Sequence, residues 1–241
     1  NSHRSRRGLA LLRYILRWSH FALLRDKKSL EVCIEAGAAR EHLVLSADTV
    51  YLQDFPFTPE PTQTKSLRIG LSLFPYFSNI ENAAAKDGEY LAICKKTVDH
   101  INLHSELPLK LYFFGSQPGS ALDDISYAKS IAKHFSNYDV RFHDYEHDTG
   151  DLIRQIGGMD IFIGMRLHLL ITAALVGVTR IWALPYQDKV VEEANALGLP
   201  ILEPGTQFDF DRRVARDKVN ARRRLAGTAL RHLADRMDGT S

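Results

Sequence analysis

The chain has 241 residues, of which 45% are hydrophobic and 25% are charged, and its formal net charge is +2. These values are typical of a folded protein with one large or two small domains, and the small net charge gives no support for a nucleic-acid partner. No stretch has the roughly 20 apolar residues that a membrane span needs. Cys33 and Cys94 lack any metal-binding spacing, so we expect the buried, reduced thiols of a cytoplasmic protein.

Residues 1–53 predict the C-terminal part of an N-terminal α/β domain. A helix is expected over 5–19, with arginines on one side and leucines on the other. Such a helix can lie on an anionic membrane surface, although a domain helix with solvated arginines is the commoner case. A strand, a helix and a second strand follow at 20–24, 26–38 and 42–52. The chain starts with neither Met nor a secretion signal, so we expect it to come from inside a longer protein, with the start of this domain missing.

A linker follows at 54–66, because three prolines fall within Asp54–Lys65 and proline cannot join a regular ladder. After it, apolar strands alternate with helices, which predicts βαβ units and a parallel sheet covered on both faces. Strands are expected at 67–74, 109–115, 139–145, 159–165, 179–185 and 200–205, and helices at 87–104, 121–135, 149–157, 167–176 and 187–198. We therefore predict an α/β fold with a Rossmann-like C-terminal domain over 67–205 and a basic helical region over 206–241, helical from 209 to 237.

Candidate functional residues lie where the strands lead into helices, since open parallel sheets bind ligands at that edge. In "IGMRLHLLITAALVGV", Ile163–Val178, Arg166 and His168 interrupt an apolar run at such a point. On an extended segment their side chains can converge beside a helix N-terminus, which favours an anion. A structural role is an equal alternative, with Arg166 in an interdomain salt bridge and His168 as a buried, hydrogen-bonded histidine.

Two neighbouring loops add weaker candidates. Lys189 stands in the first turn of the next helix, where a cation opposes the helix dipole; this conflict is typical of a functional site, although solvated lysines are also common there. The loop "FGSQPG", with Ser116 and Gln117, could hold a phosphate or contact an acceptor sugar, or it is a simple turn, because it lacks the P-loop ending. Tyr186 could also contact the acceptor.

Two acidic segments have the composition of metal sites. Carboxylates and histidines in a loop such as His143–Asp148 are more often helix caps and solvated side chains, and Asp148 is a good cap candidate. Asp209-Phe210-Asp211 has the Asp-x-Asp pattern of metal-dependent glycosyltransferases, but it follows the last strand in a charged segment. We therefore predict no metal site.

The segment 160–199 resembles the signature region of the polysaccharide pyruvyl transferase family: Gly-x-Arg-Leu-His after a strand, then Gly-Val, Tyr-x-x-Lys and Leu-Gly-Leu. The segments 22–38, with its Arg-Asp, and 45–52 are similar to upstream motifs of the family, so the resemblance covers most of residues 20–203 in order. Two features depart from the family pattern. The family's first βαβ region, with an early Gly-Asp motif, is absent, and Thr179-Arg180 stands where members often carry Pro.

The resemblance implies a GT-B-like fold, in which two Rossmann-type domains face a cleft, and a transferase that builds a pyruvate ketal on a sugar of a bacterial surface or exported polysaccharide. The donor would be phosphoenolpyruvate, with no further cofactor. Arg25, Arg166 and Lys189 would bind this anion, as its carboxylate and phosphate require, and His168 would act as the general acid.

The resemblance also implies a cytoplasmic enzyme. A lipid-linked acceptor and a peripheral contact at the inner membrane face are compatible with it, but the sequence decides neither. A sugar-nucleotide glycosyltransferase of GT-B type and a non-catalytic subunit that binds a glycan or an anion are the alternatives. The sequence predicts neither the acceptor sugar, nor the general base, nor the oligomeric state.

Overall fold

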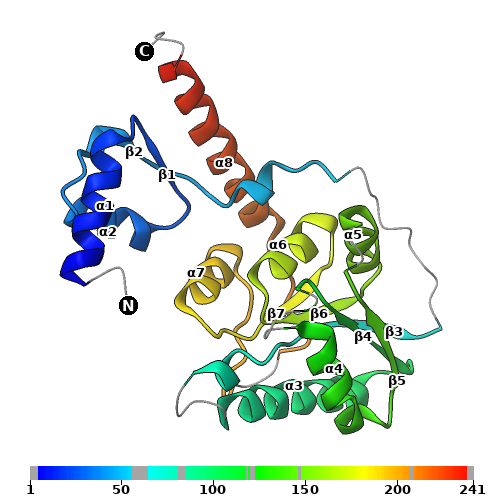
Figure 1. Ribbon diagram of the computed structural model, residues 1–241. Helices are drawn as coiled ribbons and strands as arrows, with labels where there is room; N and C mark the ends of the chain where they lie inside the picture. The colour runs from blue at the N-terminus through cyan, green and yellow to red at the C-terminus, as the bar shows by residue number, and fades with distance from the viewer. Residues whose placement is uncertain are drawn as a thin grey trace. The chain divides into compact units, whose positions relative to one another are not determined.

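The protein is described by a computed structural model that covers residues 5–55, 65–80, 85–117, 119, 123–145, 148–206 and 209–237. Most of the expected linker, residues 56–64, therefore lies outside the described part. The chain divides into two compact units, one formed by residues 1–54 with 217–241 and the other by residues 55–216 (Figure 1). No helix in the described ranges combines the length and the apolar character that a bilayer crossing requires.

The first unit contains a small parallel βαβ motif. The motif consists of β1 (Ala22–Leu24), α2 (Lys27–Glu35) and β2 (Leu43–Leu45). The unit also contains α1 (Arg6–Trp18) and the C-terminal helix α8 (Arg216–Met237). The strands β1 and β2 pair in parallel, with Ala22 opposite Leu43. The expected strand over 42–52 is too long, because the Asp48 carboxylate accepts a hydrogen bond from the backbone N–H of Val50 at 3.2 Å and starts a short 3₁₀ turn.

The second unit confirms the predicted Rossmann-like sheet. Its strands are β3 (Leu67–Ser72), β4 (Leu109–Phe114), β5 (Asp139–His143), β6 (Ile161–Gly164) and β7 (Arg180–Ala183). Its α-helices are α3 (Ala85–His104), α4 (Asp124–Ile131), α5 (Thr149–Gly157), α6 (Leu167–Val176) and α7 (Asp188–Leu197). All neighbouring strands pair in parallel.

The strand order β5-β4-β3-β6-β7 makes β3 the centre of the sheet. The chain moves outward from β3 to β5 and then returns to β6 on the other side of β3, so the topology reverses between β3 and β6. In such sheets the loops diverge at the reversal and leave a ligand-binding crevice at the carboxyl ends of the strands. In Figure 1, α3 and α4 cover one face of the sheet, and α5, α6 and α7 cover the other.

The core between the sheet and α3 and α4 explains why the strands are apolar throughout. Ile69, Leu111 and Ile163 are fully buried there, together with Val98 and Ile101 of α3. The opposite face buries side chains such as Phe162, Ile156 and Ile171. A strand covered on both faces needs apolar residues at consecutive positions, as the sequence predicts.

Two expected elements near the C-terminus differ from the structure. The strand expected at 200–205 is reduced to a single bridge from Ile201 to Ala183, because Pro200 and Pro204 remove N–H donors from the segment. The last helix begins at Arg216 rather than 209. The Asp211 N–H donates to the side chain of Asp209 at 3.1 Å, and this local bond competes with helix formation.

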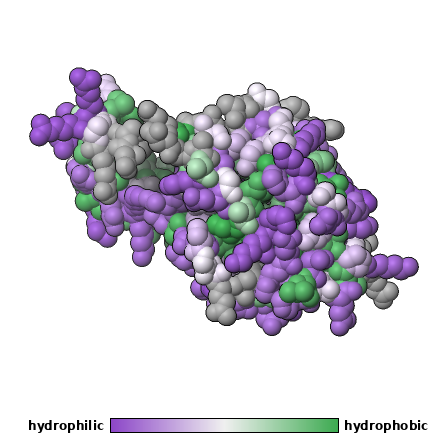
Figure 2. Space-filling view, turned by 90° about the horizontal axis from the view of Figure 1, so that it is seen from below, coloured by the Kyte–Doolittle hydropathy of each residue, from purple (hydrophilic) through white to green (hydrophobic). Residues whose placement is uncertain are grey.

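The described residues on the face drawn in Figure 2 are mixed rather than of one kind. The face drawn in Figure 2 is mostly hydrophilic, with hydrophobic residues in small patches between charged ones. The helix α1 is an exception, because four large hydrophobic side chains are more than half exposed: Leu11 (61%), Tyr14 (65%), Ile15 (52%) and Trp18 (72%). Their spacing places them on one face of the helix.

Candidate active site

The candidate site lies in the second unit, at the carboxyl ends of β3, β6 and β7. The segment after β3 carries Phe74 and Tyr76, the segment after β6 carries Arg166, and the segment after β7 carries Tyr186. Because β3 and β6 are neighbours on the two sides of the topological reversal, their loops lie where open α/β sheets bind ligands.

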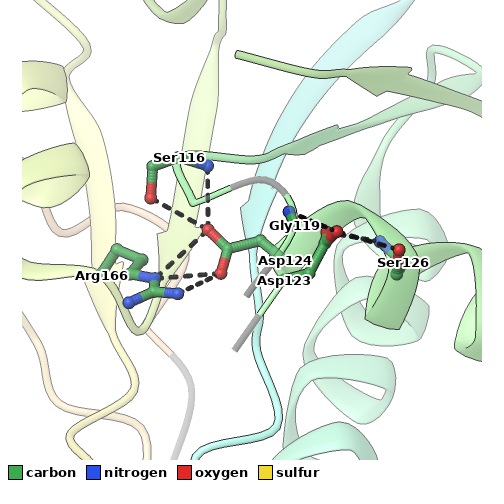
Figure 3. A network of polar contacts seen from close by, with 6 residues as sticks. All are labelled: Ser116, Gly119, Asp123, Asp124, Ser126 and Arg166. Atoms are coloured by element: carbon green, nitrogen blue, oxygen red, sulfur yellow. Dashed lines mark hydrogen bonds and ion pairs between the residues drawn. The ribbon is translucent and has the colours of Figure 1, made fainter. Parts of the chain in front are cut away.

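Arg166 forms a buried ion pair with Asp124 on α4. The Arg166 Nε–H donates to both carboxylate oxygens, at 3.1 Å to Oδ1 and 3.2 Å to Oδ2, and Nη2 makes a further contact with Oδ1 (Figure 3). The side chain of Arg166 is only 12% exposed and that of Asp124 only 1%. Both residues of this pair belong to the second unit.

Asp124 is held in place by a second residue that the sequence singled out, Ser116. The backbone N–H and the hydroxyl of Ser116 donate to Oδ2 of Asp124 at 3.0 and 2.9 Å. Burial raises the pKa of the Asp124 carboxyl above its ordinary value, although the hydrogen bonds from Arg166 and Ser116 act in the opposite direction. Sequence reasoning missed Asp124; the only signal was the pair of aspartates at the start of this helix.

The first of those aspartates, Asp123, has a different role. It caps α4 by accepting a hydrogen bond from the backbone N–H of Ser126 at 2.9 Å, and Figure 3 shows it directed away from the carboxylate of Asp124. The Ser126 and Gly119 backbone hydrogen bonds lower the pKa of Asp123. Two consecutive carboxylates thus have separate functions, since one stabilises the helix end and the other holds Arg166.

An aromatic cluster connects Arg166 to Lys189. The Arg166 guanidinium carbon lies 3.7 Å from the ring centre of Phe74, and Phe74 packs edge-on against Tyr186 with ring centres 4.9 Å apart. Tyr76 completes the cluster, 4.6 Å from Tyr186. The Lys189 Nζ lies 5.7 Å from the centre of the Tyr186 ring, so the two cations lie over different rings of the same cluster.

His168 is the second residue of α6 and is exposed to solvent, so the alternative of a buried histidine is wrong. Arg166 precedes the helix with extended backbone (φ −69°, ψ 116°). Because the helix has already begun at Leu167, the convergence expected for an extended segment does not apply to these two side chains. Arg166 is largely buried beside Asp124, whereas His168 remains accessible to a bound molecule.

The N-termini of α6 and α7 differ from those of other helices with a described cap. The helices α1, α2, α4 and α5 each follow a Ser or Asp whose side chain accepts a backbone N–H. By contrast, α6 and α7 follow Arg166 and Gln187, whose side chains make no capping hydrogen bond. The first N–H groups of a helix attract an anion when no side chain caps them, and here both helix ends border the same sheet edge.

The other residues that the sequence singled out lie outside the cluster around Arg166. Arg25 belongs to the first unit, where its Nη1 lies 3.2 Å from Oδ2 of Asp48, so its part in a shared site stays a prediction. Gln117 is exposed in its loop. The acidic segment after β5 lies partly outside the described residues, but Asp148 caps α5 as expected, accepting from the N–H of Asp151 at 3.0 Å.

Comparison with known proteins identifies a family. A family model described as polysaccharide pyruvyl transferase matches residues 3–187, more than half of the chain. Among curated proteins, none matches the chain significantly.

Two solved structures have weak overall similarity to the chain. HepE from Anabaena, in complex with UDP-glucose, is 12% identical with a TM-score of 0.48, and the match covers 98% of this chain and 60% of that one. A UDP-GlcNAc 2-epimerase from Methanocaldococcus jannaschii, in complex with UDP-GlcNAc and UDP, is 12% identical with a TM-score of 0.49, covering 86% of this chain and 54% of that one. The chain therefore spans about 60% or less of these proteins, and similarity this low does not identify its ligands.

Proposed function

Because this chain belongs to the polysaccharide pyruvyl transferase family, we propose that the protein uses phosphoenolpyruvate to form a pyruvate ketal on a sugar of a bacterial surface or exported polysaccharide. A GT-B arrangement of two Rossmann-type domains, and the activity of the whole protein, are part of this proposal. Phosphoenolpyruvate itself is the donor, and the proposal includes no further cofactor.

One observation carries the proposal: two helix N-termini without a capping side chain border the same sheet edge, and their first turns carry His168 and Lys189. Phosphoenolpyruvate has a carboxylate and a phosphate, and an anion of this kind suits the N-terminus of a helix and a lysine side chain. Tyr76 and Tyr186, the partly exposed members of the aromatic cluster, offer ring surface against which the methylene group of the donor can pack.

The chemistry needs a proton donor that a substrate can reach. His168 is exposed, and histidine is the usual general acid near neutral pH. A proton passes from His168 to the methylene carbon of the donor, which leaves an oxocarbenium-like carbon. One sugar hydroxyl attacks this carbon, phosphate departs beside Lys189, and a second hydroxyl attacks the same carbon to close the ketal. Of the two protons that the hydroxyls lose, one returns to His168 and the other protonates the phosphate. Arg25 and Arg166 orient the anionic groups.

The protein is further proposed to act in the cytoplasm at the inner membrane face, on a lipid-linked acceptor. The exposed hydrophobic face of α1 supports this location, since the helix also contains four arginines and no acidic residue and so suits an anionic lipid surface. Trp18 fluorescence should shift to the blue with phosphatidylglycerol vesicles but not with phosphatidylcholine vesicles. The substitution Leu11→Ser should weaken vesicle binding, whereas Leu103→Ser, at another exposed leucine, should not. Equal binding of the two lipids would exclude a specific anionic surface.

The proposed activity is tested with the full-length protein, phosphoenolpyruvate and a set of lipid-linked or synthetic glycans. The expected result is phosphate release together with the mass gain of one ketal-linked pyruvyl group on the sugar. Thermal protection by a nucleotide sugar, but not by phosphoenolpyruvate, would favour a glycosyltransferase instead. Biological function that survives His168→Ala but not Arg166→Ala, in a variant that circular dichroism shows to be folded, would favour a non-catalytic binding subunit.

A further inference from the structure

The positive charge of Arg166 is already compensated in the folded protein. Its guanidinium contacts both oxygens of Asp124, which is 1% exposed. A paired arginine adds little net charge for an anionic donor, so its value to the site lies in how its guanidinium is oriented. Lys189 and the N-termini of α6 and α7 are then the stronger sources of attraction for an anion.

The surroundings of Asp124 determine that orientation. Ser116 donates two hydrogen bonds to Oδ2, from its backbone N–H and from its hydroxyl, and the Arg166 guanidinium meets the carboxylate side-on (Figure 3). The guanidinium carbon lies over the Phe74 ring, 3.7 Å from its centre. Arginine has a long, flexible side chain, and its contacts with Asp124 and Phe74 restrict the orientation of the guanidinium.

The local sequence supplies two aspartates where a helix cap needs only one. Asp123 accepts the N–H of Ser126 and fills the capping position of α4. Asp124, the first residue of that helix, is therefore available to contact a residue 42 positions away in the chain. Its position in the first turn also suits a negative charge.

We propose that Asp124 is a positioning residue of the donor site, which holds the guanidinium of Arg166 against Phe74 in the orientation that binds phosphoenolpyruvate. This inference rests on the proposed function. An ordinary structural salt bridge would stabilise the fold but would have no specific effect on the affinity for phosphoenolpyruvate. The two roles are therefore distinguished by measuring this affinity in Asp124 variants that still fold.

The test is a double-mutant cycle, with phosphoenolpyruvate binding to the full-length protein measured by calorimetry. Asp124→Asn keeps the shape of the side chain but removes its charge, and it should weaken binding about tenfold. In an Arg166→Ala background the same substitution should cause no further loss, because the residue it acts through is gone. In turnover assays the KM for the donor should rise while the KM for the glycan stays unchanged.

A matched control is available one residue away. Asp123→Asn changes a neighbouring carboxylate that has no described contact with Arg166, and asparagine caps a helix as well as aspartate does, so donor binding should be unchanged. Wild-type affinity in Asp124→Asn, or an equal loss in both backgrounds, would overturn the inference while the proposed function stands. If the unaltered protein fails to bind phosphoenolpyruvate, the proposed function fails and the inference fails with it.

A second variant is needed in case Asp124→Asn does not fold, which circular dichroism would reveal. Ser116→Ala removes only the hydroxyl that donates to Asp124 and leaves the ion pair intact. It should weaken donor binding about threefold. Unchanged donor affinity in this variant would then overturn the inference.

Discussion

Replacing Arg166 by alanine should destabilise the second unit strongly, because it leaves the carboxylate of Asp124 buried without its cation. Removing one partner of a buried ion pair costs about 3–5 kcal/mol. Asp124 is 1% exposed and keeps its two hydrogen bonds from Ser116, so we expect a loss near the lower end, about 3 kcal/mol. Adding Asp124→Asn should recover most of this loss, because no buried charge remains.

The loss of stability caused by Arg166→Ala should also depend on pH, and the direction of this dependence can be predicted. Burial raises the pKa of Asp124 even with Arg166 present, and without the cation it should rise further. A raised pKa in the folded state contributes stability at pH values below the unfolded pKa, and this contribution is lost as the pH rises through the folded value. The Arg166→Ala variant should therefore be least stable, relative to the unaltered protein, near neutral pH and should recover as the pH falls.

Urea unfolding followed by tryptophan fluorescence measures this effect directly. The chain has two tryptophans; Trp182 is fully buried on β7 in the affected unit, whereas Trp18 is 72% exposed. A Trp18→Phe background therefore leaves a probe of the second unit alone. A loss below about 1 kcal/mol that does not change with pH would mean that the pair behaves as an exposed one, which would refute the reasoning.

Three further predictions address the proposed reaction and the core. His168→Gln should lower kcat by about 10²–10⁴-fold without changing donor affinity or the melting temperature, since His168 is exposed; a matching loss of affinity would argue against a general acid. Lys189→Met should weaken phosphoenolpyruvate binding about tenfold, whereas Lys96→Met on α3 should not, and equal effects would point to non-specific charge. Burial raises the pKa of Cys94 to about 12, so its thiol should resist iodoacetamide at mildly alkaline pH until the protein unfolds; rapid labelling of the native protein would contradict its burial.

The sequence was sufficient to predict the sheet and the strand ends that carry Arg166, His168 and Lys189. Continuous apolar strands such as 161–164 can only be covered on both faces, and the alternation with helices requires parallel pairing. Once the strands are parallel, Arg166, His168 and Lys189 must all lie at their carboxyl ends. Local pattern and topology rules were therefore enough to find these candidates.

The partner of Arg166 could not be predicted in the same way. The contact with Asp124 spans 42 residues and requires β4, β3 and β6 to be neighbours in that order, which periodicity does not reveal. The different exposure of Arg166 and His168 depends on the helix starting at Leu167 rather than one or two residues later. Helix boundaries depend on single hydrogen bonds, so sequence patterns locate them only approximately.

The first unit is discontinuous in the chain, since residues 217–241 group with residues 1–54. Within it, Arg222 and Arg223 of α8 donate to backbone carbonyls of Arg25 and Gln53, at 3.5 and 2.9 Å. During synthesis residues 1–54 leave the ribosome before the second unit, whereas Arg222 and Arg223 leave it after that unit. The second unit, continuous from 55 to 216, can fold while the first unit is still incomplete, so the order of folding is expected to run opposite to the order of translation.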